Sequence, residues 1–334
     1  MSDIMRFEDF KKVFDGTIFE KSKADLLEKI AKYPDRYIGL FRPTRPKAKI
    51  LQNLLQSHEI RFGDAFEAVI EEYLKLLGYE LLPKRHRNSK DEVLNLDQFF
   101  RANGKVYFIE QKVRDDHDST KKRGQIRNFE DKLVALTGQY AENELEGIFY
   151  FIDPALKKNR NYYGPELEKM KADYGVSTHI FYGQEMFTHL GLDHVWTEIL
   201  DYLKRWKEEI PDLPEINFDI DAEETFAEIK DLSPTVYREL ILKDLVFNPL
   251  MKILFPTGRT LQLLEAEFAK NPKPIYPKHF PKSWPRGVLN TELFPSPYSS
   301  GWRRHSGHGT STLNHRRIFR GTCQTLRTWS ITRS

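Results

Sequence analysis

Two acidic residues and a lysine near position 100 have the types and the spacing of a metal-dependent catalytic site. Glu110 follows Asp97 after twelve intervening residues, and Lys112 comes two positions later. Carboxylate oxygens are ligands that Mg²⁺ prefers in proteins, and a bound metal ion can neutralise phosphate oxygens and activate water. An ammonium group beside the metal can orient or deprotonate that water. We therefore expect Asp97 and Glu110 to bind Mg²⁺ and Lys112 to position the attacking water.

A β-hairpin can bring these three side chains together. Residues 94–100 and 105–112 are predicted strands, and the Asn-Gly pair at 103–104 is a strong two-residue hairpin turn between them. Side chains two residues apart on a strand point to the same face, so Glu110 and Lys112 are expected to be neighbours. Pairing of the two strands brings Asp97 within reach of both.

The alternative is a surface hairpin on which Glu110 and Lys112 form an ordinary ion pair. Apolar residues flank the charged ones on both strands, which is typical of central strands, where an unpaired charge is costly. These flanking residues are Leu94, Leu96, Val106, Phe108 and Val113. The pattern therefore favours a catalytic role.

The spacing of Asp97, Glu110 and Lys112 resembles the D…(D/E)xK signature of the type II restriction endonucleases and of the PD-(D/E)xK nuclease superfamily. The string at 63–67, GDAFE, resembles the G-x-x-F-E helix that commonly precedes the catalytic hairpin there, and residues 110–125 resemble a block from bacterial restriction enzymes. One departure is Leu96, where the family frequently has proline. The resemblance covers roughly residues 60–185.

This resemblance implies a restriction-endonuclease-like α/β core, with a central mixed β-sheet flanked by helices in the order αβββαβ. It implies Mg²⁺ as the cofactor and adds Glu67, whose carboxylate would support the metal site. A solvent-facing helix position is the alternative for Glu67.

Two segments beside the expected site combine the side chains that suit contacts with DNA. The basic stretch 83–90 contains Arg85 and Arg87, which can contact phosphates or a guanine edge. The segment after the second strand offers hydroxyls, cations and an amide, namely Ser119, Thr120, Lys121, Lys122, Arg123 and Gln125. Solvated loops are the alternative for both segments. A second metal site built from Asp115, His117 and Asp118 is less favoured than an exposed, capped loop.

Periodicity divides the chain into four expected regions. Residues 1–58 form a helical N-terminal region, with helices near 6–14, 19–32 and 45–56, and residues 59–185 form the nuclease core. Within the core we expect a helix at 60–77, strands at 79–82, 147–152 and 177–182, and helices near 125–140 and 165–174. Residues 186–278 form a helical region for DNA reading or dimer contacts. Residues 279–334 form an irregular basic tail whose composition indicates a non-native segment.

Composition excludes several other classes of protein. The 334 residues contain one cysteine, so disulfides within the chain and multi-cysteine zinc sites are excluded. No apolar run reaches the roughly 20 residues of a membrane span, and the N-terminus is not a signal peptide, so we expect a cytoplasmic protein without membrane contact. Phosphate-binding Gly-rich loops and nucleophile-elbow motifs are missing from the sequence. Nine of the 52 basic residues and one acid lie in residues 281–334, which leaves residues 1–280 mildly acidic.

The sequence therefore predicts a type II site-specific deoxyribonuclease that cleaves double-stranded DNA with Mg²⁺. Cutting both strands with one site per chain calls for a homodimer. A cognate DNA methyltransferase is expected as the functional partner in a restriction-modification system. Two alternatives stay open: a structure-specific repair or junction nuclease of the same superfamily, and a non-catalytic DNA-binding protein that kept the fold.

Overall fold

The computed structural model describes residues 3–88, 90–115, 118–270, 276–277 and 279–286. The chain divides into two units, residues 1–288 and 289–334, and every described residue belongs to the first. Most of the basic tail that the sequence predicts, from residue 287 onward, lies outside the described residues. Among the described helices, none combines the length and hydropathy of a membrane span.

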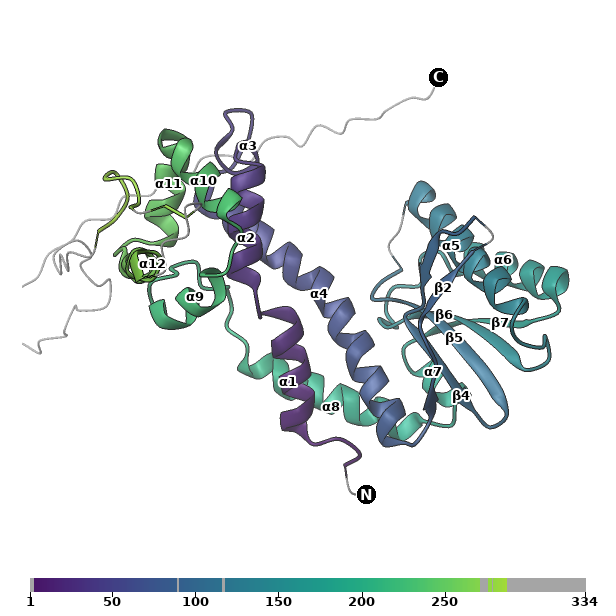
Figure 1. The fold of residues 1–334 in the computed structure, drawn as a ribbon. Helices are drawn as coiled ribbons and strands as arrows, with labels where there is room; N and C mark the ends of the chain where they lie inside the picture. Colours follow the sequence, from purple (N-terminus) through teal and green to yellow (C-terminus); the bar gives the residue numbers. More distant parts are fainter. Residues whose placement is uncertain (1–2, 89, 116–117, 271–275, 278, 287–334) are drawn as a thin grey trace, which may run out of the picture. The chain divides into compact units, whose positions relative to one another are not determined.

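A five-stranded mixed sheet lies between two layers of helices (Figure 1). Its strands, in spatial order, are β1 (Glu80–Leu81), β4 (Gln98–Ala102), β5 (Lys105–Lys112), β6 (Leu145–Phe151) and β7 (Ser177–Tyr182). The first three are antiparallel and the last three are parallel. Parallel neighbours need a crossover, which α5 (Ser119–Thr137) and α6 (Arg160–Tyr174) supply. The expected mixed sheet flanked by helices is confirmed.

The hairpin between β4 and β5 is present as predicted. Asn103 and Gly104 both have positive φ, 51° and 77°, as a type I′ turn requires. The first strand differs from its prediction, because the stretch expected as one strand over 94–100 is divided. Its first part, β3 (Val93–Asn95), pairs with β2 (Arg85–Arg87) in a separate two-stranded sheet. Asp97 therefore lies where the chain bends from this ribbon into the central sheet.

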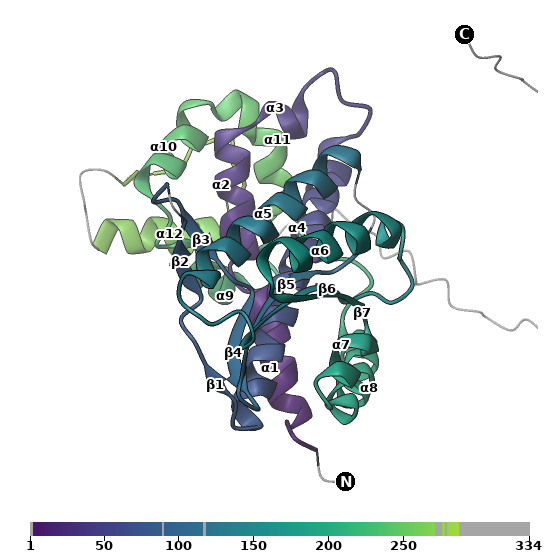
Figure 2. The same ribbon diagram turned by 90° about the vertical axis from the view of Figure 1, so that its right-hand side faces the viewer.

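The two faces of the sheet have different apolar cores because successive side chains of a strand point in opposite directions. Val106 and Phe108 of β5 pack with residues of α5 and α6. Tyr107 and Ile109 pack with α1 (Phe7–Ile18), α4 (Pro46–Leu76), α7 (Gln184–His189) and α8 (Asp193–Glu209). Figure 2 shows α5 and α6 in front of the sheet and α1 behind it.

Helix α4 is one continuous helix of 31 residues, where the sequence predicts two helices over 45–56 and 60–77. Residues 57–59 contain neither glycine nor proline, so nothing interrupts the backbone hydrogen bonds between the two apolar stretches. The boundary expected after residue 58 falls inside this helix. Leu54 in its first half and Phe66 in its second half are both buried, but they belong to different apolar cores.

The first half of α4 belongs to what we call the helical module, which consists of residues 22–54 and the described residues between 216 and 286. Its helices are α2 (Ser22–Lys32), α3 (Asp35–Ile38), α9 (Ala222–Ile229), α10 (Pro234–Leu242), α11 (Asp244–Leu254) and α12 (Arg259–Lys270). They share one apolar core, in which Leu27 and Ile50 from the first segment pack with Phe247 and Leu264 from the second. Two regions that the sequence predicts separately therefore form one module.

Residues 279–286, expected to begin an irregular tail, pack on the helical module instead. Phe280 and Trp284 are 6% and 3% exposed and belong to its apolar core. The indole Nε1 of Trp284 donates to Asp244 Oδ1 at 2.6 Å. Gly258 has a positive φ of 73°, and a Cβ there would lie 2.1 Å from the carbonyl oxygen of Pro285. The module thus extends eight residues beyond residue 278.

Candidate active site

The hairpin brings Asp97, Glu110 and Lys112 together. Gln98 pairs with Ile109 in the β4–β5 register, so Asp97 lies beside Glu110 at the adjoining position. Lys112 Nζ lies 2.7 Å from Glu110 Oε1 and 3.4 Å from Asp97 Oδ2. The backbone N–H of Gln111 donates to Asp97 Oδ2 at 2.6 Å, which holds that carboxylate against β5. The cluster lies on the α5 side of the sheet.

The donor atoms of this cluster fit a hard divalent cation. The ammonium group of Lys112 also donates to the carbonyl oxygen of Gln111 at 2.8 Å, so three oxygens from Asp97, Glu110 and the backbone surround one positive charge. Carboxylate and carbonyl oxygens are the ligands that Mg²⁺ takes. The ammonium group of Lys112 therefore occupies the position among these oxygens where a metal cation would bind. Mg²⁺ binding would require Lys112 to move to the side of this position.

Two residues of α5 complete the cluster, and the sequence analysis missed both. Lys132 forms a buried ion pair with Glu110 Oε2, and Asn128 Nδ2 lies 3.4 Å from Glu110 Oε1. Glu110 is only 3% exposed, so its charge depends on these partners. A signal for Lys132 exists in the sequence, because it lies three residues after Phe129 on the apolar face of the helix. A lysine at such a position needs a buried acid.

The charges of the cluster are strongly coupled. Burial raises the pKa of Glu110, but Lys112 and Lys132 outweigh it, so the net pKa lies below its usual value. Burial and then the charge of Glu110 raise the pKa of Asp97. Burial lowers the pKa of Lys112, but Glu110 and Asp97 outweigh it and the net pKa is raised. The pKa values of the two acids are therefore shifted in opposite directions, that of Asp97 upward and that of Glu110 downward.

Replacement of Lys132 by methionine tests this coupling. With one cation removed, burial is opposed by Lys112 alone, so the pKa of Glu110 should rise. We expect the acid limb of the pH profile for Mg²⁺-dependent cleavage to move to higher pH in Lys132→Met. The profile is measured from initial rates at saturating Mg²⁺.

The matched control for that experiment is Lys171→Met, on an exposed position of α6. It should leave the acid limb where it is in the wild type. An unchanged limb in Lys132→Met would contradict the role given to Lys132.

Glu67, the further acid implied by the resemblance, lies near this cluster on α4. Its backbone oxygen accepts a hydrogen bond from Gln98 Nε2 at 2.7 Å, which ties α4 to the start of β4. Burial and, to a smaller extent, the charge of Asp97 raise the pKa of Glu67 although Lys84 opposes them. Lys84 Nζ lies 2.8 Å from Glu67 Oε1 and 2.7 Å from Glu71 Oε2. The carboxylate of Glu67 is thus paired with Lys84, a contact that was not predicted from the sequence.

The residues expected to contact DNA lie on two elements. Arg85 and Arg87 are exposed on β2, and Arg87 Nη1 is 2.9 Å from Asp91 Oδ1. The candidate DNA-binding residues between 119 and 125 were expected in a loop ahead of a helix that starts near Gln125. Helix α5 instead begins at Ser119. The reason is Asp118, whose side chain caps the helix by accepting from the backbone N–H groups of Thr120 and Lys121.

The earlier start of the helix places residues 119–125 on the first two turns of α5. Ser119, Thr120, Lys121 and Arg123 are exposed there. Lys122 is half-buried, with its Nζ 4.5 Å from the ring centre of Tyr162. Gln125 Oε1 accepts from Tyr163 Oη at 3.3 Å. Exposed cations and hydroxyls at a helix N-terminus suit an anion.

The alternative metal site at 115–118 does not form from the described residues. Asp115 is fully buried and accepts from the backbone N–H of Asn159 and from Tyr182 Oη, both at 2.8 Å. Asp118 is the cap of α5, and His117 lies outside the described residues.

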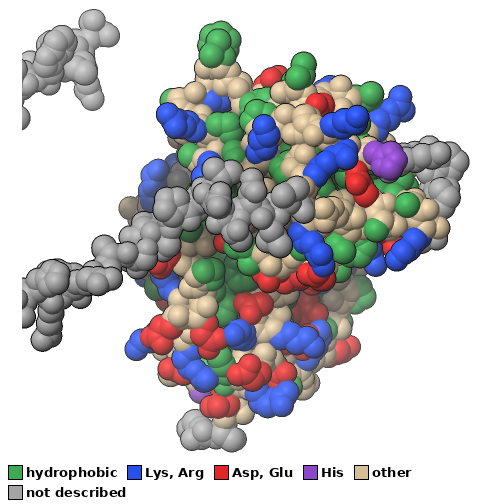
Figure 3. All heavy atoms as spheres, turned by 90° about the vertical axis from the view of Figure 1, so that its left-hand side faces the viewer, with side chains coloured by type: hydrophobic (Ala, Val, Ile, Leu, Met, Phe, Trp, Pro, Cys, Tyr) green, Lys and Arg blue, Asp and Glu red, His purple; other side chains and the backbone are tan. Residues whose placement is uncertain are grey.

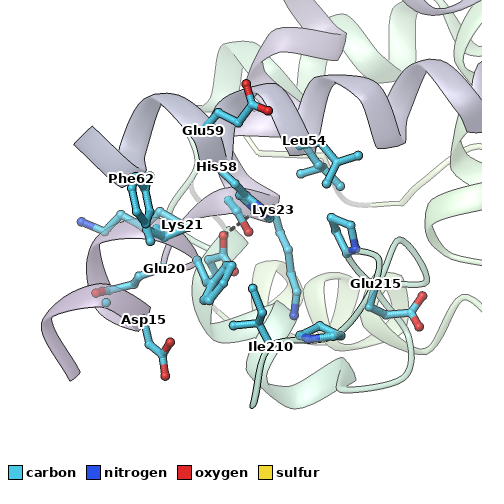
Figure 4. A pocket seen from close by; sticks show the side chains of 18 of the residues that line it. Asp15, Glu20, Lys21, Lys23, Leu54, His58, Glu59, Phe62, Ile210 and Glu215 are labelled. Carbon is cyan, nitrogen blue, oxygen red and sulfur yellow. Dashed lines mark hydrogen bonds between the residues drawn. The ribbon is translucent and has the colours of Figure 1, made fainter. Parts of the chain in front are cut away.

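A large pocket, about 1420 Å³ in volume, lies elsewhere in the same unit. Figure 4 shows its walls, with Phe62 and His58 of α4 on one side and Ile210 and Glu215 on the other. Its lining carries eight acids and three basic residues, so it does not suit a DNA phosphate backbone. Figure 3 shows a face of the molecule on which acidic and basic side chains alternate over the lower part. None of the three cluster residues lines this pocket.

A mixed sheet between helices, with an acidic pair and a lysine where β4 begins and β5 ends, defines a restriction-endonuclease-like α/β protein. Residues 79–207 match the family model "Type II restriction endonuclease, HinfI". The resemblance to type II restriction endonucleases is thereby confirmed. The matched segment runs from β1 into α8 and includes the three cluster residues but not Glu67. A search of curated proteins gave no match.

Proposed function

We propose that this chain is a type II restriction endonuclease that hydrolyses double-stranded DNA at a short specific sequence with Mg²⁺. The observation that supports this proposal most directly is the convergence of Asp97, Glu110 and Lys112 within the segment that matches the HinfI family. Double-stranded DNA is the substrate that the family implies.

In this mechanism Asp97 and Glu110 would hold the metal ion, which supplies positive charge for the phosphate and an activated water. Lys112, released from the carboxylates, would position the attacking water. Lys132 keeps Glu110 ionised inside the protein. The two carboxylates balance the charges of Lys112 and Lys132, so a divalent ion leaves an excess of two positive charges. That excess suits the scissile phosphate and the charge that develops on it.

DNA would be held by the residues that the sequence analysis singled out. Arg85 and Arg87 on β2 are proposed to contact the duplex, and residues 119–123 to bind backbone phosphates at the start of α5. We further propose a homodimer in the cytoplasm, since two copies are needed to cut both strands with one site per chain. A DNA methyltransferase of the same specificity would protect the host DNA.

Cleavage of intact plasmid DNA tests the proposal. We expect discrete fragments that require Mg²⁺, are lost in Asp97→Asn and are kept in Asp131→Asn, an exposed control acid on α5. Asparagine keeps the size of Asp97 but removes the charge that binds the metal, so activity should fall roughly 10²-fold or more.

Other outcomes distinguish the remaining functions. Cleavage restricted to branched, gapped or mismatched DNA would identify a structure-specific nuclease. Metal-independent binding without nicking at any Mg²⁺ or Mn²⁺ concentration would identify a DNA-binding protein without catalysis.

A further inference from the structure

A second cluster of potential metal ligands lies outside the nuclease site. It contains Glu146 at the start of β6, His179 on β7 and His189 at the end of α7. One ligand atom from each of them lies within 4.8 Å of the other two. His179 Nε2 is 3.3 Å from Glu146 Oε1, and His189 Nε2 contacts the same oxygen. Two imidazole nitrogens therefore converge on one carboxylate oxygen.

The cluster is separate from Asp97 and Glu110. Glu146 lies three residues before Phe149, the register partner of Glu110, which places it about 10 Å along the strand. An odd separation also puts the two acids on opposite faces of the sheet. Phe149 packs in the core on the α5–α6 side, whereas Ile148 and Tyr150, the neighbours of Phe149, pack on the other side. A ligand at the second cluster would therefore not share the nuclease site.

Glu146 has the environment of a preformed metal ligand. Its side chain is 3% exposed, so its carboxylate does not rotate freely in solvent. Lys105 Nζ lies 3.2 Å from the other carboxylate oxygen, Oε2, and so fixes the group from behind while Oε1 faces the imidazoles. The carboxylate is thus held in one orientation, with one oxygen directed at the two histidines.

The two imidazoles leave the opposite side of the cluster open. The side chains of His179 and His189 are 29% and 31% exposed, so a metal ion can reach their nitrogens from solvent. Their ring centres are 4.8 Å apart, and Phe181 packs against both rings. Zinc–ligand bonds of about 2.0 Å at tetrahedral angles place ligand atoms roughly 3.3 Å apart. The Glu146–His179 distance already has this value.

We propose that Glu146, His179 and His189 form a binding site for a transition-metal ion such as Zn²⁺, distinct from the Mg²⁺ site and with its fourth position open to water. Two imidazoles and one carboxylate suit Zn²⁺ better than Mg²⁺, which takes oxygen ligands. The metal would link β6, β7 and α7 at one edge of the fold. Zn²⁺ binding at this site does not depend on the nuclease activity.

The experiment is a Zn²⁺ titration of the metal-free full-length chain in competition with a chromophoric chelator. The variants His179→Ala and His189→Ala each remove one ligand, and Asp97→Asn removes a ligand of the nuclease site. The matched control is His194→Ala, an exposed histidine on α8. Because the two ligand variants and His194→Ala share the rest of the chain, Zn²⁺ bound elsewhere contributes equally to these three proteins.

We expect one Zn²⁺ equivalent in the wild type, in Asp97→Asn and in His194→Ala, with affinity reduced at least about tenfold in each of the two ligand variants. Circular dichroism establishes that the variants are folded, and His189→Gln, which keeps a polar side chain, is a second variant at that position. Three results would overturn the site. They are no Zn²⁺ binding by the wild type, wild-type affinity in both folded His189→Ala and folded His189→Gln, and loss of the bound Zn²⁺ equivalent in Asp97→Asn.

Discussion

Replacing Lys112 with alanine is expected to reduce Mg²⁺-dependent cleavage by roughly 10²- to 10⁴-fold while specific DNA binding is kept. Lys112 contacts both carboxylates of the cluster, and it is the cation closest to the oxygens that would hold the metal. Without it the metal ligands remain but nothing positions the attacking water. The measurements are initial cleavage rates at saturating Mg²⁺ and gel shifts of DNA carrying the site.

Lys105→Ala is the control, since Lys105 lies at the other end of the same strand and pairs with Glu146. Its cleavage rate should stay close to that of the wild type. Full activity in Lys112→Ala would contradict the assignment of Lys112 to the active site. Loss of DNA binding together with cleavage would instead give Lys112 a role in holding the substrate or the fold.

A chain ending at Lys278 is expected to be several kcal/mol less stable than a chain ending at Arg286. The shorter chain lacks Phe280 and Trp284, which are buried in the helical module, and Trp284 also bonds to Asp244. Truncating one such buried aromatic to alanine costs about 3–5 kcal/mol. The difference is measured by urea unfolding monitored by circular dichroism. The transition midpoint should lie at a lower urea concentration in the shorter chain.

The two truncations differ by eight residues and share every residue up to 278, so each is the control of the other. Equal unfolding midpoints would contradict the packing of residues 279–286 on the helical module. A chain ending at Arg286 that is as stable as the full chain would assign the stability to those eight residues alone.

The catalytic hairpin could be predicted from sequence because local chemistry specifies it. An Asn-Gly pair favours the turn, and alternation of apolar residues defines β5 with its correct limits. The bend at Asp97 could not be predicted, because residues 94–100 have the pattern of one strand. Only the pairing of β3 with β2, which depends on contacts of residues 85–87, divides it.

Other features depend on contacts between distant segments. Lys132 belongs to the cluster only because α5 packs on the face of the sheet that carries Glu110, and periodicity alone does not say which face a helix covers. The helical module joins residues 22–54 to residues 216–286, and no local pattern reports such a pairing. The start of α5 is recognisable in principle from Asp118, a residue type that favours the N-cap position immediately before Ser119.

The discontinuous helical module has a consequence for the order in which the protein is made. Its first segment, residues 22–54, leaves the ribosome before the sheet, but its apolar partners such as Phe247 and Leu264 follow only after α8. Leu27 and Ile50 therefore stay without their main packing partners while the whole catalytic sheet is synthesised. The nuclease core lies in sequence between the two segments of the helical module, so it can fold before the second segment is made. Until then the nascent chain exposes the apolar surface of the first segment, which the second segment later covers.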